Sequence, residues 1–143
     1  QLTIGYPQGK SPKILFEQIS PALKTGELVC FMGPNGIGKS TLLKTMAGLV
    51  PALSKPQPVL DPEKIAIALT DRVHAMHMTV RSLIAYGRYP YVNWKADLSS
   101  KDNEAIDHAL TLMRLEALAD KDINTLSDGQ LQMVMIARAL VQD

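Results

Sequence analysis

The stretch GPNGIGKST at residues 33–41 governs the interpretation of the whole sequence. It fits the pattern G-x-x-x-x-G-K-[ST], whose glycines let the backbone curl so that successive N–H groups point inward at an anion. The apolar run Glu27–Met32 precedes it, and Ser40–Leu49 follows with helical spacing, so the loop lies between an expected buried strand and a helix. The helix N-terminus adds a partial positive charge. This order predicts a site for the phosphates of a nucleotide.

The side chains of this loop suit the same chemistry. Lys39 supplies a full positive charge to the β and γ phosphates, the Ser40 hydroxyl is placed to coordinate Mg²⁺, and Thr41 is within reach of the α phosphate. The alternative, a glycine-rich turn that only caps a helix, is disfavoured by the strand before it. We therefore expect ATP and Mg²⁺ as ligands, held by Gly33, Pro34, Asn35, Gly36, Gly38, Lys39, Ser40 and Thr41.

The composition is that of an ordinary globular protein, with 143 residues that are 46% hydrophobic and 20% charged. The net charge of +1 gives no overall electrostatic case for nucleic acid as a partner. Residues 1–95 are basic, which suits polyphosphate, whereas residues 96–143 are acidic, as expected of exposed helix surface. The single cysteine, Cys30, cannot form an internal disulfide and fits a reduced cytosolic setting. Apolar runs fall short of the roughly 18 residues that a membrane span needs.

The remaining hydrophobic patterns predict an α/β fold. Two short apolar runs are expected to form a hairpin-like edge, and a third run is expected to form a second buried strand. One helix should carry Ile106, Leu110, Met113 and Ala117 on a single face. The expected strands are Leu2–Tyr6, Ile14–Ile19 and Lys64–Leu69, the expected helices are Thr79–Tyr86 (capped by Thr79), Ser100–Leu118 and Gln130–Gln142, and the expected loops are 51–62, Tyr89–Leu98 and Asp120–Leu126.

A second motif, LSDGQ at residues 126–130, precedes the last expected helix. Ser127 offers a hydroxyl, Gly129 lets backbone approach an anion, and the helix points its positive end at that anion. Taken alone, the motif is more simply a Ser/Asp cap on an amphipathic helix. Downstream of this phosphate loop, however, it resembles the signature motif of ABC ATPases, whose usual form is LSGGQ, with Asp128 at a position that varies in that family.

The resemblance runs along nearly the whole chain and implies a P-loop NTPase fold of the ABC type. We expect an ATPase core around the phosphate loop, an antiparallel N-terminal portion and a helical lobe near residues 72–126. In this family the signature motif reaches across a dimer, which would bring Ser127, Asp128, Gly129 and Gln130 to the partner's ATP. Tyr6 stands where the family has an aromatic residue that stacks on adenine; the alternative is a strand-end tyrosine packed on Pro7.

Residues 78–81 and 85–91 look like the segments that follow the Q-loop in ATPases of iron-siderophore and cobalamin importers. This similarity implies the ATP-binding subunit of an ABC importer, in which ATP hydrolysis drives uptake of an iron-siderophore or related metal chelate. It implies a homodimer that works with integral-membrane permease subunits, and indirectly with a substrate-binding protein, at the cytoplasmic face of the membrane. The rivals are an ABC ATPase with another substrate or with a role in DNA repair or translation, and a module that binds nucleotide without hydrolysing it.

Two departures from the family pattern stand out. Where the family has a glutamine that touches Mg²⁺ and the attacking water, this sequence has Asp71, which is either a metal ligand or a turn residue paired with Arg72. The family's Walker B strand, catalytic glutamate and switch histidine would lie beyond Asp143, and the stretch after Pro51 is short. We therefore expect residues 1–143 to be one incomplete ABC ATP-binding domain, inactive alone, with Lys39 and Asp71 as its catalytic candidates.

The segment HAMHM at residues 74–78 has the appearance of a soft-metal site, because imidazole and thioether ligands suit copper. Methionine at this spacing more often packs, and the segment lies where the family contacts its membrane subunit. We therefore favour a partner contact over a metal site. His108, on the acidic helix, is expected at the surface.

Overall fold

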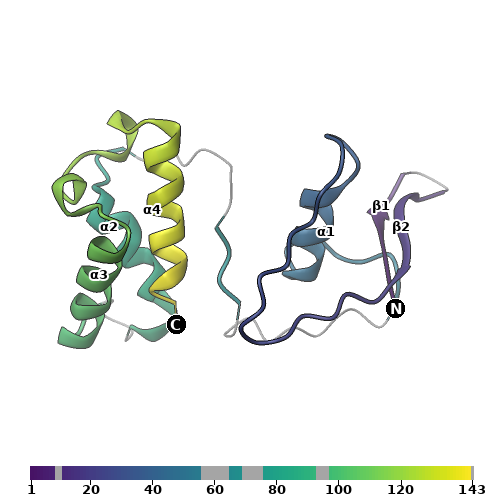
Figure 1. Cartoon of the computed structure of the whole chain (residues 1–143), viewed down its shortest axis with the longest axis horizontal. Helices are drawn as coiled ribbons and strands as arrows, with labels where there is room; N and C mark the ends of the chain where they lie inside the picture. The colour runs from purple at the N-terminus through teal and green to yellow at the C-terminus, as the bar shows by residue number, and fades with distance from the viewer. Residues whose placement is uncertain (9–10, 56–64, 69–75, 93–96, 143) are drawn as a thin grey trace. The chain divides into compact units, whose positions relative to one another are not determined.

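A computed structural model describes residues 1–8, 11–55, 65–68, 76–92 and 97–142, and the chain divides into the units Gln1–Ile65 and Ala66–Asp143 (Figure 1). The lobe expected at 72–126 lies in the second unit, which extends further to include the last helix. The first unit contains β1 (Leu2–Tyr6), β2 (Lys13–Ile19) and α1 (Lys39–Met46). The second contains α2 (Val80–Ala85), α3 (Ser100–Leu112), α4 (Asp128–Leu140) and three 3₁₀ helices, η2 (Tyr86–Tyr91), η3 (Glu116–Leu118) and η4 (Ile123–Thr125).

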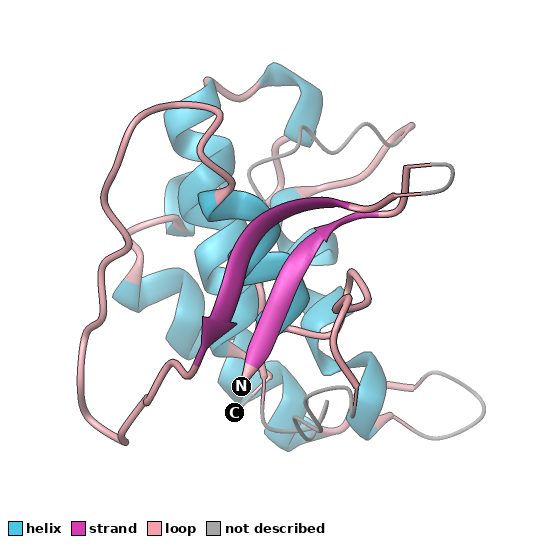
Figure 2. Ribbon diagram, turned by 90° about the vertical axis from the view of Figure 1, so that its right-hand side faces the viewer, coloured by secondary structure: helices cyan, strands magenta, loops and turns pink. Residues whose placement is uncertain are grey.

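The N-terminal hairpin confirms the predicted antiparallel portion (Figure 2). Leu2 lies opposite Ile19 and Tyr6 lies opposite Lys13, with an irregular register between these pairs. Gly5 sits at that irregularity, where an added Cβ would lie 2.0 Å from the carbonyl oxygen of Lys13, so only glycine fits. The inner face of the hairpin packs against α1 to form a small core of Leu2, Ile4, Leu42 and Ala52, flanked by Phe16, Ile19, Phe31 and Met46.

Helix α1 begins at Lys39 and ends at Met46, somewhat earlier than the predicted Leu49. The reason is Gly48, whose φ of 75° places it in the left-handed region. Its N–H donates to the carbonyl of Thr45, and the Leu49 N–H donates to the carbonyl of Lys44. This pair of bonds is a Schellman motif, which satisfies the last carbonyls of the helix and turns the chain away.

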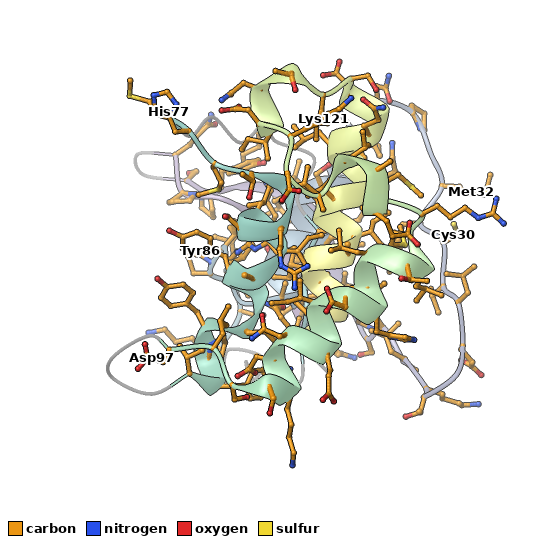
Figure 3. The ribbon with its side chains drawn as sticks, turned by 90° about the vertical axis from the view of Figure 1, so that its left-hand side faces the viewer. Cys30, Met32, His77, Tyr86, Asp97 and Lys121 are labelled. Atoms are coloured by element: carbon orange, nitrogen blue, oxygen red, sulfur yellow. The ribbon has the colours of Figure 1, made fainter. Side chains whose placement is uncertain are left out.

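The two predicted buried strands are wrong for this structure. Glu27–Met32 has no strand structure, and Leu28 and Met32 are 95% and 91% exposed on the segment shown in Figure 3. Residues 65–68 of the predicted strand Lys64–Leu69 also have none, while Lys64 and Leu69 lie outside the described residues. A buried parallel strand needs a hydrogen-bonded neighbour on each side, and the described residues place no strand beside either run.

The second unit has its own hydrophobic core, built by α2, α3 and α4. Helix α3 ends at Leu112, not at the predicted Leu118, because Arg114 adopts a φ of 55° and forms a Schellman-type end. Ile106 and Leu110 are buried as predicted, and Met113 packs partly against them. Ala117 is exposed, since the turn shifts the periodicity and Leu115 takes the buried place instead.

Local capping sets where the other helices begin. Thr79 caps α2 as predicted, with its hydroxyl accepting the N–H of Ser82. Part of the loop predicted at Tyr89–Leu98 is instead the end of η2. Helix α4 begins at Asp128, two residues before the predicted Gln130, because Ser127 is its cap. Within the described ranges, no helix has the length and apolar character that crossing a bilayer requires.

Candidate nucleotide-binding site

The phosphate loop is built at the junction of the loop and α1. Gly33, Gly36 and Gly38 have φ values of 153°, 82° and 108°, a backbone that other residues rarely adopt. The Lys39 ammonium folds back and donates to the carbonyl oxygens of Gly33, at 2.6 Å, and Pro34, at 2.8 Å. The loop therefore surrounds a positive charge at the N-terminus of a helix, where backbone N–H groups lack helical partners. Such an arrangement is suited to an anion.

Gly38 also fixes this junction to the hairpin. A Cβ at residue 38 would lie 3.0 Å from both Leu15 Cδ1 and Phe16 Cε2 on β2. Glycine is needed at this position for two reasons: the left-handed backbone and the close approach of these side chains. The start of α1 is consequently held by packing as well as by the loop.

The hydroxyl groups of the site differ in their surroundings. Ser40 is exposed in the first turn of α1, where its oxygen is accessible to a cation, so the residue fits the predicted Mg²⁺ role. Thr41 is buried, and its hydroxyl forms a short hydrogen bond with the hydroxyl of Tyr6 from β1. Pro34 and Asn35 are exposed in the loop. All the predicted ATP-binding residues thus lie in the first unit.

Tyr6 has a contact that sequence reasoning missed. Its side chain is 44% exposed at the end of β1, so the ring remains accessible for stacking, while its hydroxyl is bonded to Thr41. The two residues are separated by 35 positions, and no local pattern predicts such a pair. Adenine stacking by Tyr6 stays a prediction.

The second motif forms a capping box at the start of α4. The Ser127 hydroxyl oxygen accepts the N–H of Gln130 at 3.3 Å, and the Gln130 side-chain oxygen accepts the N–H of Ser127 at 3.0 Å. Ser127 is thus the helix cap that the simpler interpretation predicted, yet its own O–H is not used in that bond. Gly129 has an ordinary backbone and nothing within 4 Å of an added Cβ, so this chain gives no steric reason for glycine there.

The remaining candidates from the sequence are the possible metal ligands, and the structure describes only some of them. Asp71 and His74 lie outside the described residues. Met76 and His77 are exposed, and Figure 3 shows His77 projecting from the segment before α2. Among the residues that the structure describes, no group of three or more His, Cys, Asp or Glu side chains could hold a metal ion. His108 is exposed, as predicted.

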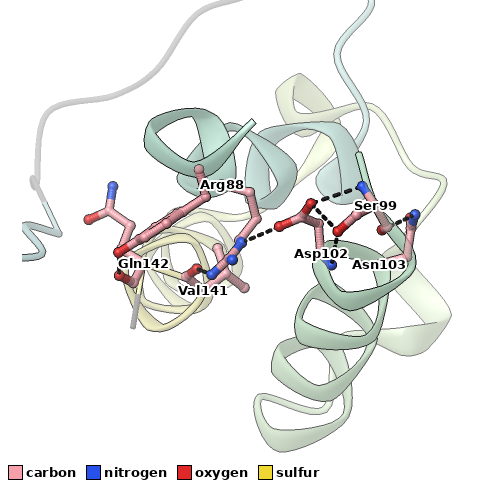
Figure 4. Close-up of polar contacts among 7 residues, drawn as sticks. Arg88, Ser99, Asp102, Asn103, Val141 and Gln142 are labelled. Carbon is pink, nitrogen blue, oxygen red and sulfur yellow. Dashed lines mark hydrogen bonds and ion pairs between the residues drawn. The ribbon is translucent and has the colours of Figure 1, made fainter. Parts of the chain in front are cut away.

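A buried ion pair in the second unit was also missed. Arg88 Nε donates to Asp102 Oδ1 at 2.8 Å, and the two side chains are only 14% and 7% exposed (Figure 4). Hydrogen bonds from the hydroxyl and then the backbone N–H of Ser99 lower the pKa of Asp102 to about 2, and Arg88 adds to this effect. The sequence does draw attention to Arg88, which lies in the segment that resembles importer ATPases. No local pattern, however, indicates that its partner is a residue 14 positions away.

Comparison with known proteins agrees with this geometry. The model of the ABC transporter family matches residues 16–143. An uncharacterized ABC transporter ATP-binding protein of Methanocaldococcus jannaschii is 36% identical over 99% of this chain and 51% of its own length. The iron(3+)-hydroxamate import ATP-binding protein of Bacillus subtilis is 33% identical over 99% of this chain and 55% of its own length. A solved inward-facing structure described as of the metal-chelate ABC transporter type gives a TM-score of 0.76 at 26% identity, covering 99% of this chain and 55% of that one.

Loop, lysine and helix define a P-loop nucleotide-binding fold. Within that class, the chain belongs to the ABC transporter family, as an ATP-binding component. The fold-class prediction is confirmed by the family match and by the structural similarity over nearly the whole chain. The chain spans about half the length of the curated relatives it matches.

Proposed function

We propose that this chain belongs to the ATP-binding subunit of an ABC importer, which couples ATP binding and hydrolysis to uptake of an iron-siderophore or related metal chelate. The observation that carries the proposal is the position of Lys39, whose ammonium lies between the Gly33 and Pro34 carbonyls at the head of α1. Carbonyl oxygens are weaker partners for an ammonium than phosphate oxygens, so the lysine is poised to exchange them for a triphosphate. An isolated structural turn would not need a charge there.

The chemistry proposed is transfer of a phosphoryl group to water, in which the protein contributes positioning and electrostatic stabilisation. Lys39 would neutralise the β and γ phosphates, and Ser40 would bind Mg²⁺, which supplies further positive charge to those oxygens when bound. Thr41 would meet the α phosphate after its hydroxyl leaves Tyr6. Asp71 is a proposed second contact to the metal.

The second motif supports a shared site between two subunits. The Ser127 hydroxyl accepts one bond within its capping box and retains its proton, so it is able to donate to a phosphate oxygen. Gly129 stands in open space on an exposed helix start, which suits the close approach of an anion from another molecule. We propose that Ser127, Asp128, Gly129 and Gln130 close over ATP held by the partner of a homodimer.

The transport role is inferred from the relatives. Their names specify import of iron(3+)-hydroxamate in Bacillus subtilis and of petrobactin in Bacillus anthracis, which favours a ferric chelate here too. The subunit would then lie at the cytoplasmic face of the membrane, against permease subunits fed by a substrate-binding protein. A manganese transport ATP-binding protein of Listeria innocua is 36% identical over 99% of this chain, so another metal substrate is the second candidate.

Equilibrium binding of a fluorescent ATP analogue to the full-length protein tests the nucleotide site. We expect Lys39→Ala to weaken binding by about tenfold or more, because a charge-assisted contact to phosphate is lost. Lys101→Ala, which removes the same charge from the exposed start of α3 in the second unit, should leave the affinity unchanged. Equal affinity for wild type and Lys39→Ala would refute the site. Uptake of radioactive iron chelates against radioactive manganese, in cells with and without the gene, separates the two transport candidates.

A further inference from the structure

Arg88 joins three elements of the second unit at one buried point. It projects from η2, its Nε donates to Asp102 in the first turn of α3, and its Nη1 donates to the carbonyl oxygen of Val141 at 2.7 Å (Figure 4). The carbon of its guanidinium lies 4.2 Å from the centre of the Tyr91 ring. Asp102 is itself fixed by bonds from Ser99, so the carboxylate that orients the arginine cannot rotate freely. The planar guanidinium is held from several directions.

The point that Arg88 holds is the C-terminal end of α4. Val141 is the residue that ends this helix, and the next carbonyl, that of Gln142, accepts a short hydrogen bond from the Tyr91 hydroxyl. A positive charge here is favoured by the negative end of the helix dipole. Gly87 completes the contact, because its bare Cα lets η2 lie directly on the Arg138 carbonyl. Side chains and backbone of η2 thus fix where α4 ends.

The same stretch of chain also fixes the region before α4. The N–H groups of Val80 and Arg81 donate to the carbonyls of Lys121 and Ala119, and the N–H of Ile123 donates to the carbonyl of Met78, at 2.9–3.0 Å. The stretch Met78–Tyr91 therefore contacts the chain shortly before Ser127 and again just after Leu140. Helix α4 is held near both of its ends by one continuous segment.

We propose that Arg88 is a positioning residue for the second motif: by holding the C-terminal end of α4, it sets the tilt of the helix whose first turn carries Ser127 and Gly129. The proposal rests on the function proposed above. Helix α4 has 13 residues. Because such a helix is about 20 Å long, a tilt of about 5° moves its far end by almost 2 Å. Displacements of about 1 Å are enough to impair a reaction that depends on positioning.

The test is ATPase kinetics of the full-length protein. Arg88→Ala should lower kcat by about tenfold, which corresponds to about 1.4 kcal/mol, while KM for MgATP stays the same because the phosphate loop is untouched. Arg88→Lys keeps the charge, but a lysine cannot bond to Asp102 and Val141 at the same time. Its kcat should therefore lie between that of the wild type and that of Arg88→Ala. Arg81→Ala is the matched control: it removes an arginine that pairs with Asp107 across the exposed faces of α2 and α3, and should leave both constants unchanged.

Mixing variant subunits separates positioning from a general loss of folding. Arg88→Ala mixed with Lys39→Ala should regain activity, because the intact motif of the lysine variant then faces the intact phosphate loop of the arginine variant. Mixed with Ser127→Ala it should regain none, since both motifs are impaired. Regain with Ser127→Ala, or with neither variant, would overturn the proposal. If Arg88→Ala does not fold, Tyr91→Phe replaces it in the same mixtures, with a smaller loss.

A separate mixture tells failure of this inference from failure of the proposed function. Lys39→Ala mixed with Ser127→Ala contains one complete site in each mixed dimer and should be active. If that mixture is inactive, the shared site itself is wrong, and the proposal for Arg88 falls with it. If that mixture is active while Arg88→Ala shows unchanged kcat, only the role of Arg88 is refuted.

Discussion

At the scale of single residues, the hydrogen bond between the Tyr6 and Thr41 hydroxyls competes with the contacts to a nucleotide that are expected of both residues. Their mutual hydrogen bond must break, or turn, if Thr41 is to meet a phosphate while the Tyr6 ring stacks on a base. We therefore expect the ring and the hydroxyl of Tyr6 to make separable contributions to ATP affinity. Substitutions at this one position distinguish them.

We expect Tyr6→Ala to weaken ATP binding by about tenfold, because base–aromatic stacking contributes roughly 1–3 kcal/mol. Tyr6→Phe keeps the ring and should change affinity by less than about threefold, since one neutral hydrogen bond contributes only about 1 kcal/mol or less. Titration with the fluorescent ATP analogue measures both. Binding of tripolyphosphate, which has no base, serves as the control and should be the same for Tyr6→Ala and wild type. An equal loss in both variants would instead show that the hydroxyl, and not the ring, matters.

Asp102 predicts a pH dependence of stability. Its pKa is about 2 in the folded protein against a usual value of 3.8, mainly because Ser99 and then Arg88 donate to the carboxylate. The folded state thus binds fewer protons than the unfolded state between these values, so the contribution of Asp102 is full above pH 4 and is lost as pH falls toward 2. Asp102→Asn should remove the part of the pH dependence of the unfolding free energy that comes from this residue.

Urea unfolding of the full-length protein at pH 5, 4 and 3 measures the effect, followed by a signal from the second unit. Asp102→Asn is expected to be less stable at pH 5 and to lose less stability on acidification than wild type. Asp107→Asn is the control, because its ion pair with Arg81 is exposed and screened by solvent. A slope for Asp102→Asn identical to that of wild type would contradict the assignment of the ion pair.

Residue-level features were predictable only where the chemistry is local. The phosphate loop is contiguous, so its pattern alone identifies Lys39 and its neighbours. The pairs Tyr6–Thr41 and Arg88–Asp102 join residues 35 and 14 positions apart, and they exist only because packing brings separate elements together. A sequence pattern carries no information about such distances.

At the scale of elements, the contact of η2 with α4 depends on the absence of a side chain at Gly87. A Cβ at Gly87 would lie 2.3 Å from the Arg138 carbonyl oxygen and 2.4 Å from Val141 Cγ2, which is far inside van der Waals contact. Gly87→Ala should therefore force the elements apart and destabilise the protein by about 1–3 kcal/mol. Thermal unfolding measures the loss.

Gly129→Ala is the matched comparison for Gly87→Ala. Nothing lies within 4 Å of a Cβ at residue 129, and alanine is the better helix former, so stability should not fall. If the second motif contacts the partner's ATP, Gly129→Ala should nevertheless lower ATPase activity. Equal destabilisation by both substitutions would show that the close packing at Gly87 is not the cause.

The element boundaries show which signals are legible in a sequence. Thr79 and Ser127 were expected near helix starts, because a side-chain oxygen at a cap acts over three residues. The end of α3 was misplaced, since Arg114 takes the left-handed conformation that glycine usually supplies. Hydrophobic spacing continued past this turn and suggested a longer helix than the one that forms.

At the scale of the whole molecule, the segment before the phosphate loop leaves apolar side chains without cover. Leu28 and Met32 are almost fully exposed, and Leu23 is more than half exposed. Uncovered apolar segments with strand-forming sequence associate with one another. We expect residues 1–143, expressed alone, to form oligomers or aggregates in light scattering at micromolar concentration.

Replacing both exposed side chains, Leu28→Ser with Met32→Ser, should reduce that association. Leu112→Ser is the control, because Leu112 is another exposed leucine, 58% exposed at the end of α3 in the second unit. A monodisperse wild-type sample, or equal effects of the two changes, would contradict the explanation. The parallel strand predicted for this segment is wrong for a related reason: a continuous apolar run is a property of the sequence, whereas a strand needs a neighbour with which to pair.

The exposed segment also contains a thiol whose rate of alkylation reports how often the segment is open to solvent. The one thiol of the sequence, Cys30, lies between Leu28 and Met32 and is exposed. In residues 1–143, an alkylating reagent would therefore modify a single known sulfur atom, and the rate of that reaction would follow the fraction of time for which the segment is open to solvent. Labelling of Cys30 that is slower in the full-length protein than in residues 1–143 would show, without any substitution, that this part of the chain is covered there.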